Sequence, residues 1–562
     1  MIPQFNPLSS FYPLSLFANG EPGFWLNPSD LSTMYQDSAG TTPVTAVEQP
    51  VGLILDKSKG LVLGSELVTN GGPFTNTSGW ANTTPANGTL SASGGLLTFT
   101  TTNIDFATFA ITTVVGKWYK VAATIASAAC PGFYAIRKAD DTAVTTNIVT
   151  FINTSTGSGG GYFLATATTS YIVLQINGAG TASISLASCK SLAGTHYYQS
   201  TAGVRPVLSA RVNLLTKTEA LANAAWSKIK GGTGVTPVAT DAFALAPDGT
   251  LTASRVQLSV AAGTAGTDYS AITQSGTTIV GSNNRRAVWL MLNSGTSAVI
   301  DLSDGGGDSN ITVTNAWQLF YVDRVADATG RGMYLGIQGN TGTAKTVDLL
   351  VWHPDYRPVD QATGLIPTYQ RVNTSTDYDT AGFPLYLSGN GTQWMQCAAQ
   401  DYTGVNKMLV CGGVRSINTT DGMSLEIGNV GVTNGSLLFG EWFSSRWYFG
   451  ARNVNTPQRY ATTYPQPITS VLSCAYDLAA ATIPTQITPR VNTATPTLTD
   501  TGSAATPGTF GNVPGYLFCR AGTSLFFTGN IYQLIARGST VASNAAQIAA
   551  TENWTDLKTK AY

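Results

Sequence analysis

The sequence predicts an all-β protein made of tandem antiparallel β-sandwiches that follow an extended N-terminal segment. The first observation is that short runs rich in β-branched and aromatic residues, such as 171–176, 347–352 and 531–536, recur after residue 60. Clusters of Gly, Asn, Asp and Thr separate these runs, as in antiparallel sandwiches. The second is that helical periodicity is almost absent. The third is length, because 562 residues suffice for three or four domains with separate cores.

Composition predicts a neutral, polar surface. Charged residues make up 11% of the chain, against roughly 25% in an average soluble domain. The net charge of −1 gives no long-range attraction toward nucleic acid or an anionic membrane, so we expect no nucleic-acid partner. No apolar stretch reaches the ~18 residues of a transmembrane helix, so we expect no membrane insertion. Pro3, Pro7 and Pro13, with no basic residue before them, also argue against a signal peptide.

The most informative stretch opens with GEPGFWLNPSDLSTMYQ and ends with LDKSKG. Asn27 or Ser29 is placed to cap a short helix, and Leu31, Met34 and Tyr35 would share one face of that helix. An extended run follows this helix. The stretch therefore reads as an adaptor, and not as an independent domain or a disordered tail.

This stretch resembles a segment near the start of many tailed-bacteriophage and prophage virion proteins, in which it precedes lectin-like β-sandwiches. The resemblance implies that residues 1–60 attach the chain to other virion proteins. It also implies a homotrimer, although the sequence contains no coiled-coil signal of its own.

Residues 61–193 are predicted to form the first jelly roll. Their segments LGSELVTNGGPFTNTSGW, GKWYKVAATI and YIVLQI resemble jelly-roll carbohydrate-binding modules of secreted glycanases and phage fibres. Trp80 is equally well explained as a core residue and as a platform for a sugar ring.

Residues 212–358 are predicted to form a second jelly roll, after a linker at 194–211. The opening NLLTKTEALANAAWSKIKGG and the later APDGTLTASRVQL resemble spike and fibre modules of phages. A second linker at 359–367 leads to residues 368–562. That last part resembles laminin-G or concanavalin A-like sandwiches, with GNIYQLIARG as a closing strand.

A C-terminal helix is predicted over residues 543–560. Ile548, Trp554 and Leu557 are expected to dock this helix on the last sandwich.

One joint predicts how the modules are connected. In relatives, the Asp-Lys-Ser of the adaptor is followed closely by a Gly-x-His segment, whereas here Asp56 is separated from Gly194 and His196 by the whole first sandwich. The first sandwich is therefore predicted to be an insertion. Its two ends should lie close together, as in a sandwich whose terminal strands pair.

Motifs of catalysis are absent from the sequence, which favours a protein that is not an enzyme. His196 and His353 are the only histidines and stand in no nucleophile arrangement, and there is no GxSxG, HExxH or P-loop. A polysaccharide-degrading tailspike remains an alternative that needs two carboxylates across a cleft. The parallel β-helix repeats typical of such enzymes are not visible.

Calcium is the only cofactor for which the sequence gives a candidate site. Asp301, Asp304 and Asp308, in DLSDGGGDSN, offer oxygen ligands on a Gly-rich backbone that can fold tightly. The alternative is a solvated turn between two strands.

Aromatic residues predict a ligand site in GEWFSSRWYFG. Trp442, Trp447 and Tyr448 lie near Arg446 there, and Trp394 is a weaker candidate. Sugar sites pair a flat aromatic face with charged or amide groups. Alternation along two strands would instead turn about half of these aromatics into the core.

Two further patterns leave alternatives open. The six cysteines have no metal-ligand spacing and favour buried free thiols, with Cys130 and Cys189 as the best disulfide pair if bridges form. Arg285 and Arg286 are candidates for salt bridges between subunits or for contacts to an anionic sugar, unless they belong to a solvated turn.

Together these observations lead to a phage virion structural protein, namely a tail fibre or tail-tip receptor-binding protein that attaches the particle to a bacterial surface glycan or pilus. The expected location is the virion, assembled in the host cytoplasm. The first alternative is a capsid head fibre or decoration protein, and the second is the tailspike enzyme.

Overall fold

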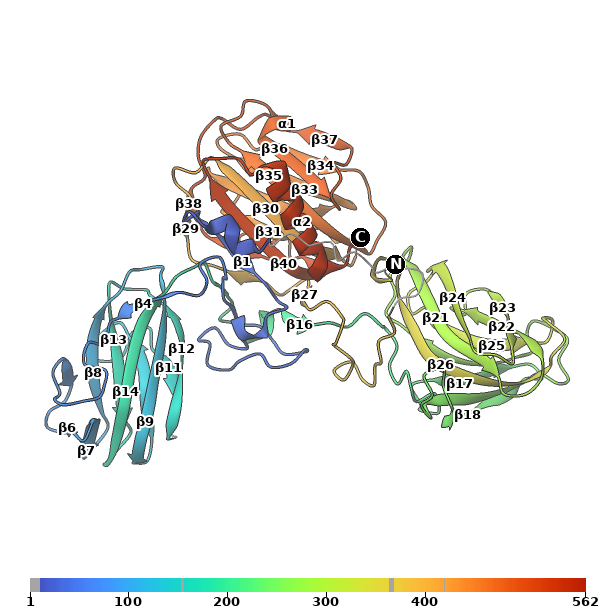
Figure 1. Cartoon of the computed structure of the whole chain (residues 1–562), viewed down its shortest axis with the longest axis horizontal. Helices are drawn as coiled ribbons and strands as arrows, with labels where there is room; N and C mark the ends of the chain where they lie inside the picture. Colours follow the sequence, from blue (N-terminus) through green and yellow to red (C-terminus); the bar gives the residue numbers. More distant parts are fainter. Residues whose placement is uncertain (1–10, 153–155, 363–367, 419) are drawn as a thin grey trace, which may run out of the picture.

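The chain folds into antiparallel β-sandwiches, as predicted, and Figure 1 shows them as three lobes. The computed structural model describes residues 11–152, 156–362, 368–418 and 420–562. Within these ranges no helix is long and apolar enough to span a membrane. The three lobes are called the first, the second and the C-terminal sandwich below.

The first sandwich packs two sheets over a core that includes Phe99, Ile172 and Ile184. Strand β4 at its start pairs with β14 at its end, with Leu63 opposite Leu192. This pairing confirms the expectation that the two ends of the insertion lie close together. In spatial order, one sheet is β11 (Val149–Ile152), β10 (Phe133–Ala139), β13 (Thr169–Ile176), β8 (Asp105–Thr112) and β5 (Trp80–Asn82), and the other is β12 (Gly157–Leu164), β9 (Trp118–Ala129), β14 (Gly180–Leu192), β7 (Leu96–Thr101) and β6 (Gly88–Ser93), with β4 (Leu63–Glu66) beside β14.

The second sandwich has two five-stranded sheets around an aliphatic core. Alternate residues of each strand enter this core, so the other residues form the two outer faces. In spatial order, one sheet is β17 (Ser227–Gly231), β20 (Tyr269–Ser275), β25 (Gly332–Gln338), β22 (Ser297–Ser303) and β23 (Asn310–Thr314), and the other is β18 (Val235–Ala244), β19 (Ala253–Ser259), β26 (Thr346–Pro358), β21 (Asn283–Leu292) and β24 (Gln318–Val325).

The C-terminal sandwich is assembled from distant parts of the chain. Short strands from the N-terminal region and from the joint at 194–211 complete both of its sheets. One sheet is β16 (Val207–Ser209), β27 (Tyr386–Asn390), β40 (Thr528–Ser539), β30 (Lys407–Ser416), β35 (Ile468–Asp477) and β36 (Ile487–Val491), with β1 (Gly23–Leu26) paired to β40; the other is β2 (Met34–Tyr35), β3 (Leu53–Ile54), β15 (Tyr197–Tyr198), β28 (Met395–Gln396), β39 (Gly515–Leu517), β31 (Gly422–Ile427), β32 (Ser436–Phe443), β33 (Arg446–Arg452), β34 (Gln458–Ala461) and β37 (Leu498–Thr501). Beside them lie β29 (Gln400–Asp401) paired with β38 (Asn512–Val513), the helix α1 (Ile483–Gln486), and the 3-10 turns η1 (Pro13–Phe17), η3 (Ala202–Val204) and η4 (Val359–Gln361).

The described part of the predicted adaptor is thus an integral part of the C-terminal sandwich. All four residues of β1 pair with β40, and Phe24 is 1% exposed. The predicted short helix is wrong, because only the 3-10 turn η2 (Leu31–Thr33) forms and Met34 then enters strand β2. Met34 and Tyr35 pair with strand β3 instead of continuing a helix, and this pairing buries Met34 completely. Residues 1–10 lie outside the described residues.

Asp56 joins the two chain segments that lead into and out of the first sandwich. Its Oδ1 accepts hydrogen bonds from the backbone N–H groups of Trp25 (2.8 Å) and Ser58 (2.7 Å). Its Oδ2 accepts from the Thr195 N–H (2.7 Å) and the Ser58 hydroxyl (2.8 Å), and its own N–H donates to His196 Nδ1 (2.9 Å). The residues on the two sides of the insertion therefore meet, as the joint predicted.

The second sandwich is inserted in the same way. Strands β16 and β27, which flank it in sequence, pair with each other. The Asn213 amide group donates to the carbonyls of Pro354 (3.2 Å) and Gln370 (3.0 Å), which brings the exit and return of the chain together. The predicted linker 194–211 therefore supplies strands β15 and β16, whereas most of the other linker, 363–367, lies outside the described residues.

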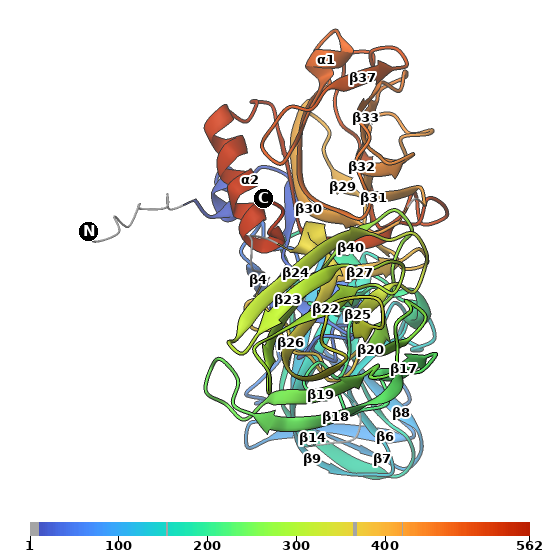
Figure 2. The same cartoon turned by 90° about the vertical axis from the view of Figure 1, so that its right-hand side faces the viewer.

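Helix α2 (Ala545–Thr559) forms close to the predicted limits and lies on the outer face of the sheet that contains β30 and β40 (Figure 2). The prediction of which residues dock this helix is only partly correct. Leu557 is 53% exposed, and much of the helix face that is buried on the sheet is polar. Glu552 accepts hydrogen bonds from the Ser473 hydroxyl and from Arg490, and Thr555 accepts one from Gln533 (3.1 Å). This polar face meets polar side chains of the sheet, Ser473 and Gln533, whereas Trp554 packs on the apolar cluster that contains Trp25 and Ile535.

Candidate functional site

The two tryptophans predicted to contact a ligand lie in the hydrophobic core. Trp442 and Trp447 are 0% exposed and pack edge to face, with ring centroids 4.7 Å apart. The hairpin of β32 and β33 places them opposite each other on its inner face. The prediction that they bind a ligand is therefore corrected, because neither ring can offer a face to solvent.

Arg446 and Tyr448 lie on the outer face of the same hairpin. Tyr448 stacks on Tyr460 with ring centroids 4.6 Å apart, and the Arg446 guanidinium lies 5.1 Å from the Tyr460 ring. Trp394 is half-buried and packs against the core of the C-terminal sandwich. The five predicted residues thus separate into a buried pair, an outer pair and one residue on a loop.

The three predicted calcium ligands do not converge. Asp304 is turned into the protein, where Oδ2 lies 3.3 Å from Arg286 Nη2 and Oδ1 lies 3.6 Å from Arg324 Nη1. The described residues contain no group of three or more His, Cys, Asp or Glu side chains that would hold a metal ion. Asp304 is therefore removed from the predicted set, because two arginines already compensate its charge.

Asp301 and Asp308 instead line an open groove of about 360 Å³ on the second sandwich. The groove runs over the outer face of the sheet that contains β20, β25 and β22. Its described lining consists of Ile229, Gly266, Tyr269, Thr273, Asp301, Ser303, Gly305, Gly307, Asp308, Tyr334 and Gln338.

Two tyrosines supply the aromatic part of the groove, and both lean over glycines. A Cβ atom on Gly231 would lie 2.2 Å from Tyr269 Cε1, and one on Gly336 would lie 2.9 Å from Tyr334 Cε1. Each ring therefore occupies space that any other residue would fill. Because glycine has no side chain, each ring can approach the backbone of the sheet, where Tyr269 is partly exposed and Tyr334 is 8% exposed.

Polar groups complete the groove. Asp301 Oδ1 accepts a hydrogen bond from the Ser309 N–H (2.7 Å), and Asp301 Oδ2 accepts one from the Ser303 hydroxyl (3.0 Å). Burial raises the pKa of Asp301 above its usual value, and the nearby Asp308 adds to the rise. Gln338 Nε2 donates to Asp308 Oδ1 at 2.7 Å, which fixes the rim of the groove.

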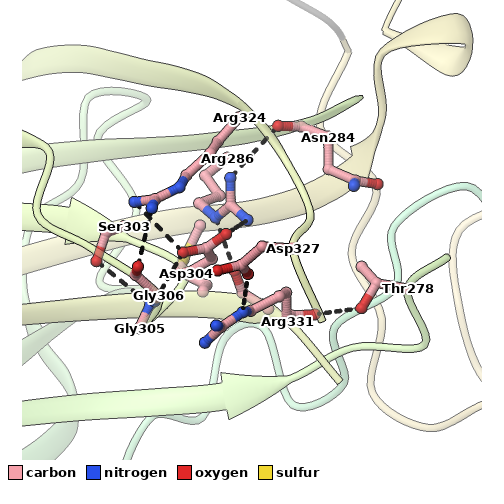
Figure 3. A network of polar contacts seen from close by, with 12 residues as sticks. Thr278, Asn284, Arg286, Ser303, Asp304, Gly305, Gly306, Arg324, Asp327 and Arg331 are labelled. Atoms are coloured by element: carbon pink, nitrogen blue, oxygen red, sulfur yellow. Dashed lines mark hydrogen bonds and ion pairs between the residues drawn. The ribbon is translucent and has the colours of Figure 1, made fainter. Parts of the chain in front are cut away.

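The loop that carries Gly305, Gly307 and Asp308 is held from behind by the network in Figure 3. Asp304 Oδ1 accepts a hydrogen bond from the Gly306 N–H (2.9 Å), and Arg324 donates to the carbonyls of Gly306 (3.0 Å) and Gly307. Arg286 is fully buried and compensates the charge of Asp304. The two predicted basic residues thus have structural partners, because Arg285 pairs with Asp323 (2.7 Å).

The aromatic part of the groove was missed by the sequence reasoning, although a signal exists. Tyr334 and Gly336 are two residues apart in strand β25, and Gly231 lies opposite Tyr269 across β17 and β20. A tyrosine and a glycine that are two residues apart on one strand are therefore a pattern that can be detected in the sequence. Choosing it among the many glycines of this chain requires the strand order.

The remaining candidates have structural surroundings. All six cysteines are free thiols and five are buried, so Cys130 and Cys189 are not bridged. His196 is fully buried, and burial lowers its pKa to about 3. His353 stacks between Trp352 and Tyr369, with ring centroids 3.4 and 3.6 Å away, and burial lowers its pKa to about 4.

Comparison with known proteins yields no family for this chain. No protein-family model matches it, and no curated protein matches it. One solved structure that matches is the N-terminal CBM22-1-CBM22-2 tandem domain of Xyn10C from Paenibacillus barcinonensis, at 12% identity and a TM-score of 0.23. The match covers 53% of this chain and 98% of that chain. A similarity of this size supports no conclusion about function.

Proposed function

We propose that this chain is a non-enzymatic, glycan-binding structural protein of a phage particle, and that it acts as a tail fibre or tail-tip receptor-binding protein. The observation that carries the glycan-binding part is the groove of the second sandwich, where two tyrosine rings lie close to glycines and Asp301 and Asp308 are also part of the lining. The phage assignment is supported by the sequence resemblances of the N-terminal stretch and of the second sandwich.

The groove has the chemistry that a sugar ring requires. The apolar C–H face of a sugar packs on a flat aromatic ring, while its hydroxyls exchange hydrogen bonds with carboxylate and amide groups. A shallow, open groove is expected to bind a single glycan weakly. Several copies on one particle would raise the avidity by ~10² to 10⁴ where all sites engage together, and the proposed homotrimer would provide such copies.

Replacing the two tyrosines tests the glycan-binding part. The double substitution Tyr269→Ala and Tyr334→Ala in the full chain should weaken binding to arrayed bacterial surface polysaccharides by about 10- to 100-fold, since losing a buried aromatic contact costs roughly 1–3 kcal/mol. Tyr321→Ala is the matched control, because Tyr321 is a 45% exposed tyrosine on the other sheet of the same sandwich, away from the groove. Equal binding by the double variant and the unmodified chain would refute the groove as the site.

The position on the particle needs a separate experiment. The resemblance of the second sandwich to phage spikes also favours a capsid head fibre or decoration protein. Gold-labelled antibody against this chain should mark the tail or its tip in electron micrographs. Labels on the capsid would replace the tail assignment with the capsid alternative.

A further inference from the structure

We infer that the groove of the second sandwich selects glycans without acidic groups, and that its two carboxylates exclude anionic polysaccharides. This inference rests on the proposed glycan binding. It goes further by naming the class of ligand that the site accepts. The argument depends on which charges face the groove, where the nearest cations are engaged, and which hydrogen-bonding partners remain for a ligand.

The groove is lined by acidic and neutral residues. Asp301 and Asp308 are its charged members, and no lysine or arginine occurs among the described residues that line it. Asp308 is exposed, whereas Asp301 is 4% exposed. An anionic ligand would therefore approach like charge without a compensating cation, which disfavours its binding.

The nearest cations are engaged outside the groove. Arg324 donates to the carbonyls of Gly306 and Gly307 and lies 3.6 Å from Asp304. Arg331 pairs with Asp327 at 2.6 Å (Figure 3). The positive charge of these guanidinium groups weakens the negative potential of Asp301 and Asp308. The hydrogen bonds and ion pairs of Arg324 and Arg331, however, hold both side chains behind the loop.

Two of the lysines near the groove, Lys228 and Lys345, are engaged by backbone carbonyls, and Lys230 lies on the opposite face of its strand. On β17, Lys228 donates to the carbonyls of Ala222 (2.9 Å) and Asn223 (2.8 Å). Lys345 donates to the Gly339 carbonyl. Lys230 alternates along β17 with Ile229 and Gly231, and these two residues belong to the face that carries the groove.

The hydrogen-bonding capacity that Asp308 leaves unused also favours a ligand that donates hydrogen bonds. Asp308 Oδ1 accepts from Gln338, while Asp308 Oδ2 accepts no hydrogen bond from any described residue. A carboxylate only accepts, so it is satisfied by a sugar hydroxyl and not by another carboxylate, sulfate or phosphate. The structure therefore matches a ligand rich in hydroxyls and free of acidic groups, since selectivity arises from both the fit and the repulsion.

A polysaccharide array tests the inference with the full chain. Bacterial surface polysaccharides are sorted in advance into those with uncharged repeat units and those with carboxylate, sulfate or phosphate groups. The unmodified chain should bind the best uncharged polymer about tenfold or more tighter than the best acidic one. Raising NaCl from low to high concentration should leave binding of the uncharged polymer unchanged, because no ion pair is formed.

A charge variant supplies the second measurement. Asp308→Asn should increase binding of acidic polymers severalfold and change binding of uncharged polymers much less. Asp500→Asn is the matched control, because it removes one acidic charge from the C-terminal sandwich, where Asp500 pairs with Arg459 at 2.6 Å. Each variant is compared by its melting temperature to confirm that it folds.

The outcomes separate the inference from the proposed function. Acidic polymers bound as tightly as uncharged ones, or no gain from Asp308→Asn, would overturn the selectivity while leaving glycan binding in place. No polymer bound by the unmodified chain would overturn the proposed function and the inference with it. Preference for uncharged polymers that is lost in the Tyr269→Ala and Tyr334→Ala variant would support both.

Discussion

At the scale of single residues, buried polar side chains hold this protein together where the chain crosses between modules. Asp56 collects four donated hydrogen bonds from Trp25, Ser58 and Thr195. In the groove loop, Asp304 accepts one hydrogen bond from the Gly306 N–H and lies beside Arg286 and Arg324. A carboxylate in such a position accepts from several backbone N–H groups that would otherwise be buried without partners, and leaving such groups unpaired is costly.

The first prediction concerns Asp56. Asp56→Asn should lower the free energy of unfolding by about 2–4 kcal/mol, because the new amide group cannot accept the N–H donors that one oxygen now satisfies. Urea denaturation followed by tryptophan fluorescence measures the change. Asp500→Asn, at a partly exposed ion pair, should alter the midpoint very little. An unchanged midpoint for Asp56→Asn would show that the joint contributes no stability.

The second prediction concerns Glu426 in strand β31, a fully buried carboxyl whose pKa burial raises to about 7. Its two oxygens accept hydrogen bonds from the N–H groups of Val430 and Ala521, both at 3.0 Å. Between about pH 4.5, where the unfolded group titrates, and the raised pKa, the folded state keeps a proton that the unfolded state has lost. Stability from this group is therefore full below this window and falls as pH rises through it.

The effect is measured as a difference between two proteins. Relative to Glu426→Gln, the unmodified chain should lose up to about 3 kcal/mol of unfolding free energy between pH 4.5 and pH 8. Taking the difference removes the contribution of the titrating groups that do not interact with Glu426. A difference that stays constant across this pH range would contradict the raised pKa of Glu426.

At the scale of elements, the groove depends on how neighbouring strands match. Tyr269 on β20 lies opposite Gly231 on β17, and Tyr334 on β25 lies two residues from Gly336. The Ala271 side chain is paired with Gly336 between them. The small residues leave space above the sheet, so a tyrosine ring on each of two adjacent strands can lie close to the backbone.

The third prediction tests this arrangement. Gly231→Ala places a methyl group 2.2 Å from Tyr269 Cε1 and 2.6 Å from the Thr267 carbonyl, so the ring must tilt away. Binding of the preferred polysaccharide should weaken by about fivefold or more, and the melting temperature should fall by a few degrees. Gly203→Ala is the control, since nothing lies within 4 Å of its added methyl group. Undiminished binding would mean that the ring position is unimportant.

At the scale of the whole molecule, the first and the second sandwich are both insertions into the C-terminal sandwich. The N-terminal strands and β15 and β16 complete sheets whose other strands come from residues 386–539. Each insertion leaves and returns through a paired joint, which allows it to fold as a unit while the C-terminal sandwich closes around its own core. The first insertion also packs on the N-terminal strands, because Trp118 and Tyr162 share a buried cluster with Leu53 and Leu55.

The fourth prediction follows from this connectivity. A fragment of residues 368–562 should fail to fold cooperatively, because it lacks β1 and β16 from one sheet and β2, β3 and β15 from the other. A chain in which residues 64–191 are replaced by two glycines should remain folded, because Leu63 and Leu192 are paired. Circular dichroism and size-exclusion chromatography distinguish the two. Cooperative unfolding of the fragment would show that the N-terminal strands are dispensable.

The sequence predicted much of the architecture and little of the site. Alternating strand patterns, turn residues and the displaced Asp56 joint were enough to predict sandwiches and the first insertion. Strands of two residues such as β2, β3 and β15 are too short to give a periodic pattern, so their place in the C-terminal sandwich was not predictable. The inward position of Trp442 and Trp447 depends on the register of a hairpin, and a shift of one residue reverses the face.

By itself, the sequence determined the all-β class, the low content of charged residues, the presence of several sandwiches and the C-terminal helix, because composition and local periodicity are properties of neighbouring residues. The tertiary structure alone decided which tyrosines share a groove, where Asp304 turns and which strands complete the C-terminal sandwich. These features depend on strand order in space. The groove joins β17, β20, β25 and β22, whose spatial order differs from their order along the chain.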